Sequence, residues 1–133
     1  LLIVEPEQAN CLQQSARAGE PVAVTGDLTT LMAGLACGEV SSLAWRILAV
    51  GTDDFLTLSE DAIPATMRLL AQGFELDPAI EAGESAVPGL AAAVIARSSV
   101  DLSKAMGLDA NSRVLVIGTE GATDPELYKA LIQ

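Results

Sequence analysis

The sequence predicts an α/β fold with a parallel sheet, and three observations support this prediction. The apolar run Val114 to Ile117 lies between Arg113 and a glycine-containing polar turn, which is typical of a strand buried on both faces. A second strand pattern, 54–58, leads directly into a helix start at Ser59. Half of the residues are hydrophobic but only 3% are aromatic, so the core consists mainly of Ala, Leu, Val and Ile. Such small side chains let helices pack closely against a sheet.

The first half of the chain contains patterns for two strands besides the one at 54–58 and for three helices. We expect a strand at 1–6, a helix at 7–17 ended by Gly19 and a short strand at 21–25. A helix capped by Asp27 follows, with its apolar face at 28–35 and its stop at Gly38, and then a helix capped by Ser41 or Ser42 and closed by Gly51. This last helix is apolar nearly all round, which predicts that it is buried. The strand at Leu1 has no turn before it, and domains rarely begin in mid-strand. We therefore expect a cut or processed N-terminus and a chain that is the back part of a longer protein.

The second half contains helix signals separated by polar turns. Ile63, Met67, Leu70 and Phe74 keep the spacing of one helical face after Ser59, and a helix beginning there would be kinked at Pro64. We also expect one turn at 77–80 and a helix capped by Ser85 with Pro88 in its first turn. A short helical or irregular piece at 101–108 and a turn at 109–112 follow. The last helix is expected to have Asp124 as its N-cap, Pro125 in its first position and Glu126 near the positive end of its dipole.

The charge of the chain limits its partners. Lys and Arg number 7 against 18 Asp and Glu, which gives a net charge of -11. Such a surface repels phosphate backbones and anionic membranes, so we expect neither nucleic-acid nor membrane binding. No apolar run approaches the roughly 20 residues that span a bilayer, and no basic region precedes Leu1 as in a signal peptide. A cytoplasmic location is expected.

Histidine and cysteine usage limits the chemistry. The chain has no histidine, which excludes Ser/His/Asp and Cys/His catalytic arrangements and the usual zinc clusters. The two cysteines, Cys11 and Cys37, do not form a Cys-x-x-Cys motif. Two interpretations stay open: two buried thiols, since free cysteine behaves as a small hydrophobic residue, or a Cys11–Cys37 disulfide.

Two polar stretches are candidates for ligand contact. Gly118 to Thr123 follows the predicted strand at 114–117, and ligands of open α/β sheets bind beyond the carboxyl ends of strands. A plain strand-to-helix connection is the alternative. Glu84 immediately precedes a predicted helix, where a carboxylate also has the simpler role of stabilising the helix N-terminus, by about 0.3 to 1 kcal/mol.

Several blocks resemble diaminopropionate ammonia-lyase, in the same order and over essentially the whole chain. They are Val4-Glu-Pro-Glu-Gln-Ala-Asn-Cys-Leu12 with Gln14-Ser15, Val24-Thr-Gly-Asp27, Met32-Ala-Gly-Leu-Ala-Cys-Gly-Glu39, Gly83-Glu-Ser85 and Gly118-Thr-Glu-Gly-Ala-Thr-Asp124. The first block is specific to that family, and the general layout is similar to pyridoxal-phosphate enzymes related to tryptophan synthase β, threonine dehydratase and serine racemase. The resemblance implies a fold type II enzyme with a three-layer, open, twisted and mostly parallel sheet with helices on both faces. Residues 1–133 would be a single segment, the C-terminal part of its large cofactor-binding domain.

The resemblance also implies roles for individual residues. Such enzymes hold pyridoxal phosphate on a lysine, take the α-proton of an amino-acid substrate and expel its β-amino group, which yields pyruvate and ammonia. Thr119 matches the strand-end hydroxyl that hydrogen-bonds the pyridine nitrogen, and a neutral partner there favours elimination. Glu84 matches an acid near the ring, with Ser85 beside it. Glu120 and Gly121 would complete the turn around the ring edge, where glycine permits close approach.

Some positions depart from the family pattern. Gly118 and Ala122 replace a usual Ser and Asp, which thins the hydrogen bonding around the ring. The acid that holds a cation in some relatives is missing in the region of Asn10 and Cys11, so no metal is expected. Lys104 and Lys129 lack the context of a Schiff-base lysine, and the glycine-rich phosphate loop is missing.

The resemblance therefore implies the C-terminal segment of an ammonia-lyase for 2,3-diaminopropionate, a homodimer acting on a small amino acid. The isolated chain is expected to be inactive. Two alternatives stay open: another β-eliminating or β-replacing enzyme of the same fold, similar to serine/threonine dehydratase, and a non-catalytic remnant or binding module.

Overall fold

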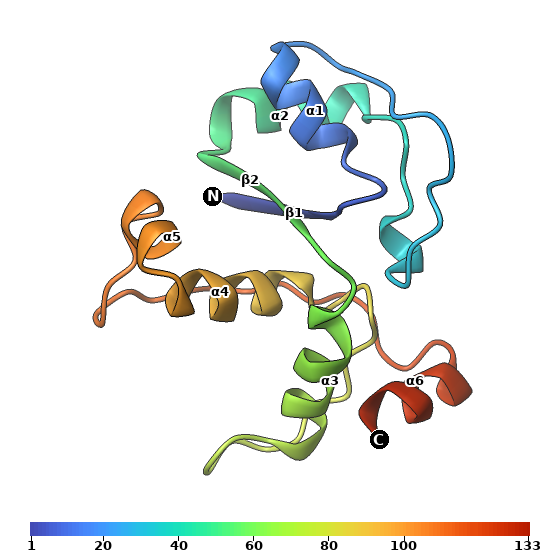
Figure 1. Ribbon diagram of the computed structural model, residues 1–133, viewed down its shortest axis with the longest axis vertical. Helices are drawn as coiled ribbons and strands as arrows, with labels where there is room; N and C mark the ends of the chain where they lie inside the picture. Colours follow the sequence, from blue (N-terminus) through green and yellow to red (C-terminus); the bar gives the residue numbers. More distant parts are fainter. The chain divides into compact units, whose positions relative to one another are not determined.

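A computed structural model describes all residues from Leu1 to Gln133, and the chain forms two compact units, Leu1–Glu60 and Asp61–Gln133 (Figure 1). The elements, in order, are β1 (Leu2–Pro6), α1 (Cys11–Ala18), the short 3₁₀ helix η1 (Ala33–Leu35), α2 (Ser42–Gly51), β2 (Asp54–Leu58), α3 (Ala62–Gln72), α4 (Pro88–Ser98), α5 (Val100–Ala105) and α6 (Pro125–Ile132). None of these helices is long and apolar enough to cross a membrane.

The first unit contains a parallel pair of strands, which confirms the predicted strands at 1–6 and 54–58. β1 pairs with β2 in parallel, with Leu2 opposite Asp54 and Pro6 opposite Leu58 (Figure 1). Parallel strands need a crossover connection, and here it contains α1, η1 and α2. α1 packs against β2.

Helix α1 begins at Cys11, later than the predicted start at Glu7. The amide of Glu7 donates to the carbonyl of Leu58 at 3.2 Å, so this residue still belongs to the sheet edge. The predicted end is confirmed, because Gly19 has a left-handed backbone with φ 77° and donates to the Ser15 carbonyl at 2.8 Å.

Two predicted elements between α1 and α2 do not form. The stretch 21–25 is not a strand, because the Val22 amide bonds to the Ser15 hydroxyl at 2.8 Å instead of a neighbouring strand. The helix predicted at 28–35 shrinks to η1. Side-chain oxygens accept hydrogen bonds from backbone amides that would donate to carbonyls in a helix. Glu60 Oε1 accepts from the Leu31 amide at 2.7 Å, and Thr30 Oγ1 accepts from the Met32 amide at 3.1 Å.

Helix α2 confirms the predicted cap but not the predicted burial. The Ser41 hydroxyl accepts from the Ala44 amide at 3.4 Å. No residue of α2 is buried, and Leu43, Ile47 and Val50 are exposed. A helix that is apolar on all sides needs neighbours on all sides, and the first unit is too small to supply them.

The second unit is built mainly from α3, α4 and α6. α3 begins at Ala62, so Pro64 falls in its first turn, where it costs no internal hydrogen bond. α4 begins at Pro88 and its N-cap is Val87, so the predicted cap Ser85 is wrong. Ala91, Ala92 and Ala96 of α4 are buried, as their small size predicts.

The connections of the second unit also differ in detail from prediction. The turn expected at 77–80 lies earlier, since the Asp77 amide donates to Phe74 at 2.8 Å. The predicted turn at 109–112 is confirmed by a bond from the Ser112 amide to the Asp109 carbonyl at 3.3 Å.

The stretch 114–117, predicted as a strand buried on both faces, is neither paired nor buried. The sheet contains only β1 and β2, and Leu115 and Ile117 are 87% and 78% exposed. Val116 approaches α4, since a Cβ added at Gly89 would lie 3.1 Å from its side chain. A strand exists only with a hydrogen-bonded neighbour, and none of the described residues supplies one.

Helix α6 has the predicted start. Asp124 Oδ1 accepts from the amides of Glu126 and Leu127 at 3.1 and 3.0 Å, and Pro125 is the first helical residue. At the other end, the Arg68 guanidinium of α3 donates to the Leu131 carbonyl at 2.8 Å. A cation there complements the helix dipole and fastens α6 to α3.

Candidate functional site

Two loops that lie far apart in the sequence meet within the second unit. The first is 83–85, before α4, and the second is 118–123, before α6. The Gly83 amide donates to the Glu120 carbonyl at 3.1 Å, and the Ser85 amide donates to Glu120 Oε2 at 2.8 Å. The structure therefore brings together all five residues predicted to surround the cofactor, Glu84, Ser85, Thr119, Glu120 and Gly121.

Glycine is required at position 83 by the closeness of the two loops. A Cβ built there would lie 2.7 Å from Glu120 Oε2 and closer still to the Gly121 carbonyl oxygen, which belongs to the backbone. Any larger residue would push the loops apart. The Gly-Glu-Ser block and the Glu-Gly block thus form one packed structure.

Glu84 is the buried acid of this site. Its residue exposure is 5%, yet its carboxylate makes no hydrogen bond or ion pair within the chain. The residue as a whole is covered, but its carboxylate oxygens are not among the side-chain atoms that are both buried and unbonded, of which the Thr52 hydroxyl is the one example. The Glu84 carboxylate therefore keeps contact with its surroundings and is not bonded to any group of the fold.

Thr119 and Glu120 differ in what their side chains contact. Thr119 is exposed, and no hydrogen bond of its hydroxyl occurs within the chain. Its neighbours on either side, Gly118 and Glu120, line a cavity of about 320 Å³. The other residues that line this cavity belong to α3, to α4, to the segment before α4 and to the stretch 114–117. They are Leu70, Ile80, Glu81, Ala82, Ala86, Val87, Leu90 and Val116. Alternate residues of this stretch thus face the cavity, and Thr119 does not line it.

Sequence reasoning missed Glu81 as part of this site. Its Oε1 accepts a hydrogen bond from the Ala122 amide at 3.3 Å. Glu81 thus binds the backbone of the second loop, as Glu120 binds the backbone of the first. The signal was its place two residues before Gly83, in a run of acids around the Gly-Glu-Ser block. Glu81 and Glu120 together supply three acceptors at this junction: Glu81 Oε1, the Glu120 carbonyl and Glu120 Oε2.

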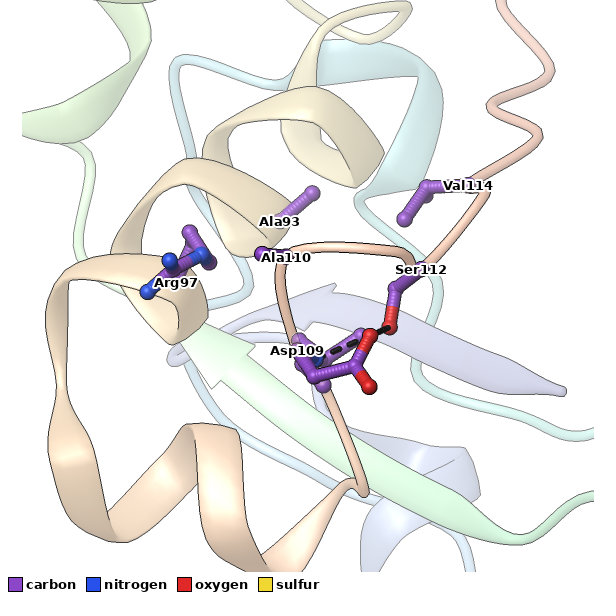
Figure 2. A pocket seen from close by; sticks show the side chains of 7 residues that line it. Ala93, Arg97, Asp109, Ala110, Ser112 and Val114 are labelled. Atoms are coloured by element: carbon purple, nitrogen blue, oxygen red, sulfur yellow. Dashed lines mark hydrogen bonds between the residues drawn. The ribbon is translucent and has the colours of Figure 1, made fainter.

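A second cavity, of about 400 Å³, lies between the end of α4 and the loop after α5 (Figure 2). Ala93 and Arg97 of α4 line it together with Asp109, Ser112 and Val114 (Figure 2). A hydrogen bond from the Asn111 amide, a further one from Ser112, and the Arg97 charge lower the pKa of Asp109. None of the five predicted cofactor residues lines this cavity, so it is separate from the candidate site.

The two lysines of the chain lie away from the two loops. Lys104 is in the last turn of α5 and is exposed. Lys129 of α6 is exposed as well and forms an ion pair with Glu126 at 3.1 Å. Neither location resembles the buried setting in which a lysine serves as an imine-forming nucleophile.

The first unit has a buried acid of a different kind, Glu5, which sequence reasoning did not single out although it lies in the most specific of the quoted blocks. Its two carboxylate oxygens accept from the amides of Leu12 and Gln13 at 2.9 and 2.8 Å, and Cys11 Sγ lies 3.8 Å from Oε1. The carboxylate caps α1 in place of Asn10, whose side chain makes no cap bond. Burial raises the pKa of Glu5 although these hydrogen bonds oppose it.

Both cysteines are free, which excludes the disulfide interpretation in this structure. Cys11 is buried as predicted, whereas Cys37 is exposed, so the expectation of two buried thiols holds for Cys11 alone. Burial, and then the nearby Glu5 charge, raise the pKa of the Cys11 thiol. A thiol held protonated in this way is unreactive.

The fold and the paired loops define a class of protein. Residues 1–120 match the family described as pyridoxal-phosphate dependent enzyme, and the chain belongs to this family. The cofactor of the family is pyridoxal phosphate, as the resemblance implied.

Within this family, the chain is similar to enzymes that are named diaminopropionate ammonia-lyase. The chain is 38% identical to the diaminopropionate ammonia-lyases of Salmonella typhimurium (strain LT2) and Escherichia coli (strain K12), over 99% and 98% of its length. It spans about a third of the length of these curated relatives. It also matches the crystal structure of the Escherichia coli diaminopropionate ammonia lyase in complex with an aminoacrylate-PLP azomethine reaction intermediate, with a TM-score of 0.88, 34% identity and coverage of 98% of this chain and 33% of that one.

A more distant solved structure supports the fold class. The T.th. threonine deaminase matches with a TM-score of 0.64 and 26% identity over 73% of this chain and 34% of that one. The predicted α/β class with a parallel sheet, of the fold type II kind, is confirmed.

The donor set of the two loops fits the ring end of pyridoxal phosphate. The loops offer a hydroxyl at Thr119 and a carboxylate at Glu84, neither of which is bonded to another group of the chain. They offer no lysine and no cluster of side chains for the phosphate.

Proposed function

We propose that the protein to which this chain belongs is a pyridoxal-phosphate-dependent ammonia-lyase that converts 2,3-diaminopropionate to pyruvate and ammonia by α,β-elimination. The observation that carries the proposal is the 38% identity to diaminopropionate ammonia-lyases along nearly the whole chain. Residues 1–133 would form the C-terminal part of its large cofactor-binding domain. The isolated chain would be inactive.

Thr119 would supply a neutral hydrogen-bonding partner to the pyridine nitrogen. When bound, the cofactor serves as an electron sink for the carbanion formed at the substrate α-carbon. A hydroxyl does not hold the pyridine nitrogen protonated as an aspartate would, which favours elimination over other outcomes. The exposure of Thr119 and the lack of an internal bond for its hydroxyl support this role.

The remaining four residues would form the wall beside the ring. Glu84 would be the acid next to the cofactor, and the lack of any bond from its carboxylate within the chain supports this assignment. Ser85, Glu120 and Gly121 would hold the backbone of both loops close to the ring edge. Their mutual contacts within the second unit are consistent with such a rigid wall.

Location, assembly and substrate class are part of the same proposal. We expect a cytoplasmic homodimer that acts on a small amino acid and binds neither nucleic acid nor membranes. The net charge of -11 supports the exclusion of polyanionic partners.

The direct test is a substrate comparison with the complete enzyme. Pyruvate release should proceed with a higher kcat/KM from 2,3-diaminopropionate than from serine, and threonine should yield little 2-oxobutyrate. A preference for serine or threonine would favour the runner-up, a dehydratase of the same fold, which the similarity to a threonine deaminase makes the relevant alternative.

The 133-residue chain alone provides a second test. It should give no absorbance from a bound cofactor and no pyruvate from 2,3-diaminopropionate, because it lacks a lysine in a suitable setting. Activity of this chain would contradict the proposal that it is an inactive fragment of the enzyme. The proposal that 2,3-diaminopropionate is the substrate would still be decided by the substrate comparison.

A further inference from the structure

Glu120 contacts the 83–85 loop through both its main chain and its side chain. Its carbonyl accepts from Gly83 at 3.1 Å, and its carboxylate Oε2 accepts from Ser85 at 2.8 Å. Its other oxygen, Oε1, accepts from the Thr123 hydroxyl at 3.4 Å. One residue therefore holds the backbone on either side of Glu84.

Both carboxylate oxygens of Glu120 accept hydrogen bonds from groups within the chain. Glu120 also lines the cavity of the second unit, which Thr119 does not line. Glu84, by contrast, forms no hydrogen bond or ion pair with its carboxylate within the chain. Of the two acids, Glu120 is the one whose carboxylate oxygens are both bonded within the chain.

The amide of Ser85 is the decisive contact. A hydrogen bond to a charged acceptor is stronger than one between neutral groups, and it fixes the peptide that follows Glu84. The close packing of Gly83 on Gly121 fixes the peptide that precedes it. The direction of the Glu84 side chain is thus set by its two neighbouring peptides.

We infer that Glu120 is a positioning residue, which does not touch the cofactor but holds the 83–85 loop so that Glu84 is presented to it. This inference rests on the proposed function, since it assumes that Glu84 meets pyridoxal phosphate. It assigns Glu120 a role behind the ring wall instead of the ring contact expected from the resemblance.

The first experiment needs no cofactor and no activity. Hydrogen exchange at the Ser85 amide is followed by mass spectrometry in the cofactor-free complete enzyme. Glu120→Ala should accelerate this exchange by about tenfold or more, because the amide loses a charged acceptor. Glu120→Gln, whose amide oxygen still accepts, should accelerate it less. Glu126→Ala, the same change at an exposed acid of α6, should leave it unchanged.

The second experiment is a double-mutant cycle on the loaded enzyme. Glu120→Ala should lower kcat by about tenfold to about 100-fold, as expected when a reacting group is misplaced by a fraction of an ångström. In a Glu84→Ala background the same substitution should change kcat by less than about twofold, because its effect passes through Glu84. Equal losses in both backgrounds would overturn the inference.

Glu120→Gln covers the case in which Glu120→Ala does not fold. It should keep Ser85 exchange and kcat both within about threefold of the parent, since the hydrogen bond survives. A large loss of kcat with unchanged exchange would mean that the charge of Glu120 acts on the cofactor directly, which contradicts the inference. A parent enzyme that releases no pyruvate from 2,3-diaminopropionate would reject the proposed function instead, whatever the exchange result.

Discussion

Each unit buries one glutamate, and the two differ in what surrounds them. Glu5 of the first unit is 7% exposed, and each of its carboxylate oxygens accepts from an amide of α1. Glu84 of the second unit is 5% exposed and has no partner within the chain. The exposed fractions are nearly the same, so burial alone does not distinguish the two acids.

The difference lies in the hydrogen bonds that each acid completes. Glu5 lies near the end of β1 and caps α1, so its carboxylate joins the strand to the helix. Glu84 lies in a loop held by other residues, and its carboxylate is not bonded within the chain. The proposal that Glu84 meets the cofactor of the family rests on this difference.

The largest effect on the functional side is expected from Thr119→Val in the complete enzyme. The substitution keeps the shape but removes the hydroxyl proposed to meet the pyridine nitrogen, so kcat should fall by about 100-fold. The unfolding midpoint should hardly change, since this hydroxyl has no partner in the chain. Steady-state kinetics and thermal unfolding check the two parts.

Thr52→Val is the matched control for Thr119→Val. The Thr52 hydroxyl is buried without a hydrogen bond at the end of α2, so its removal should leave turnover unchanged and the midpoint equal or higher. Unchanged turnover in Thr119→Val would reject the role of Thr119.

A smaller effect, on stability, is expected from Gly83→Ala. Its new methyl group would collide with the Gly121 carbonyl, a backbone atom that cannot rotate away, and should cost about 2 kcal/mol of unfolding free energy. Gly51→Ala is the control, because nothing lies within 4 Å of a Cβ added there and the residue ends α2. It should raise stability by about 0.5 kcal/mol. Chemical denaturation measures both, and equal effects would show that the two loops are not tightly packed.

The smallest effect concerns pH and Glu5. Burial raises the folded-state pKa of Glu5 above its ordinary value of 4.5, so in this range the folded protein binds more protons than the unfolded chain. The stability of the parent relative to Glu5→Gln should therefore fall as pH rises from 4.5 through the raised pKa, and stay constant above it. Denaturation curves at a series of pH values check this, and a relative stability that rises over that range would contradict the assignment.

Local sequence signals predicted those parts of the fold that local contacts determine. The caps Ser41 and Asp124, the helix end at Gly19 and the strands at 2–6 and 54–58 follow from neighbouring residues, and all are confirmed. The predictions of a strand at 21–25 and a helix at 28–35 were wrong, because side chains accept hydrogen bonds from the backbone amides of these segments. Ser15 and Glu60 are two of these acceptors. Pattern alone does not reveal such partners.

The candidate site was predictable in its residues but not in its geometry. The resemblance named both loops, and the structure brings them together through Glu120. The stretch 114–117 was expected to be a buried strand, but a strand needs a neighbour that no described residue provides. That Glu120 is bonded within the chain while Glu84 is not depends on the three-dimensional arrangement of the two loops.

The most direct test of the contrast compares Glu5→Ala with Glu84→Ala in the complete enzyme, by unfolding of the cofactor-free form and the absorbance spectrum of the loaded form. Glu5→Ala should lower stability by about 1 to 3 kcal/mol, because two amides lose their acceptor, and leave the spectrum unchanged. Glu84→Ala should leave the unfolding midpoint nearly unchanged and alter the spectrum of the bound cofactor. A Glu84→Ala enzyme that is as destabilised as Glu5→Ala, with the parent spectrum, would contradict the account.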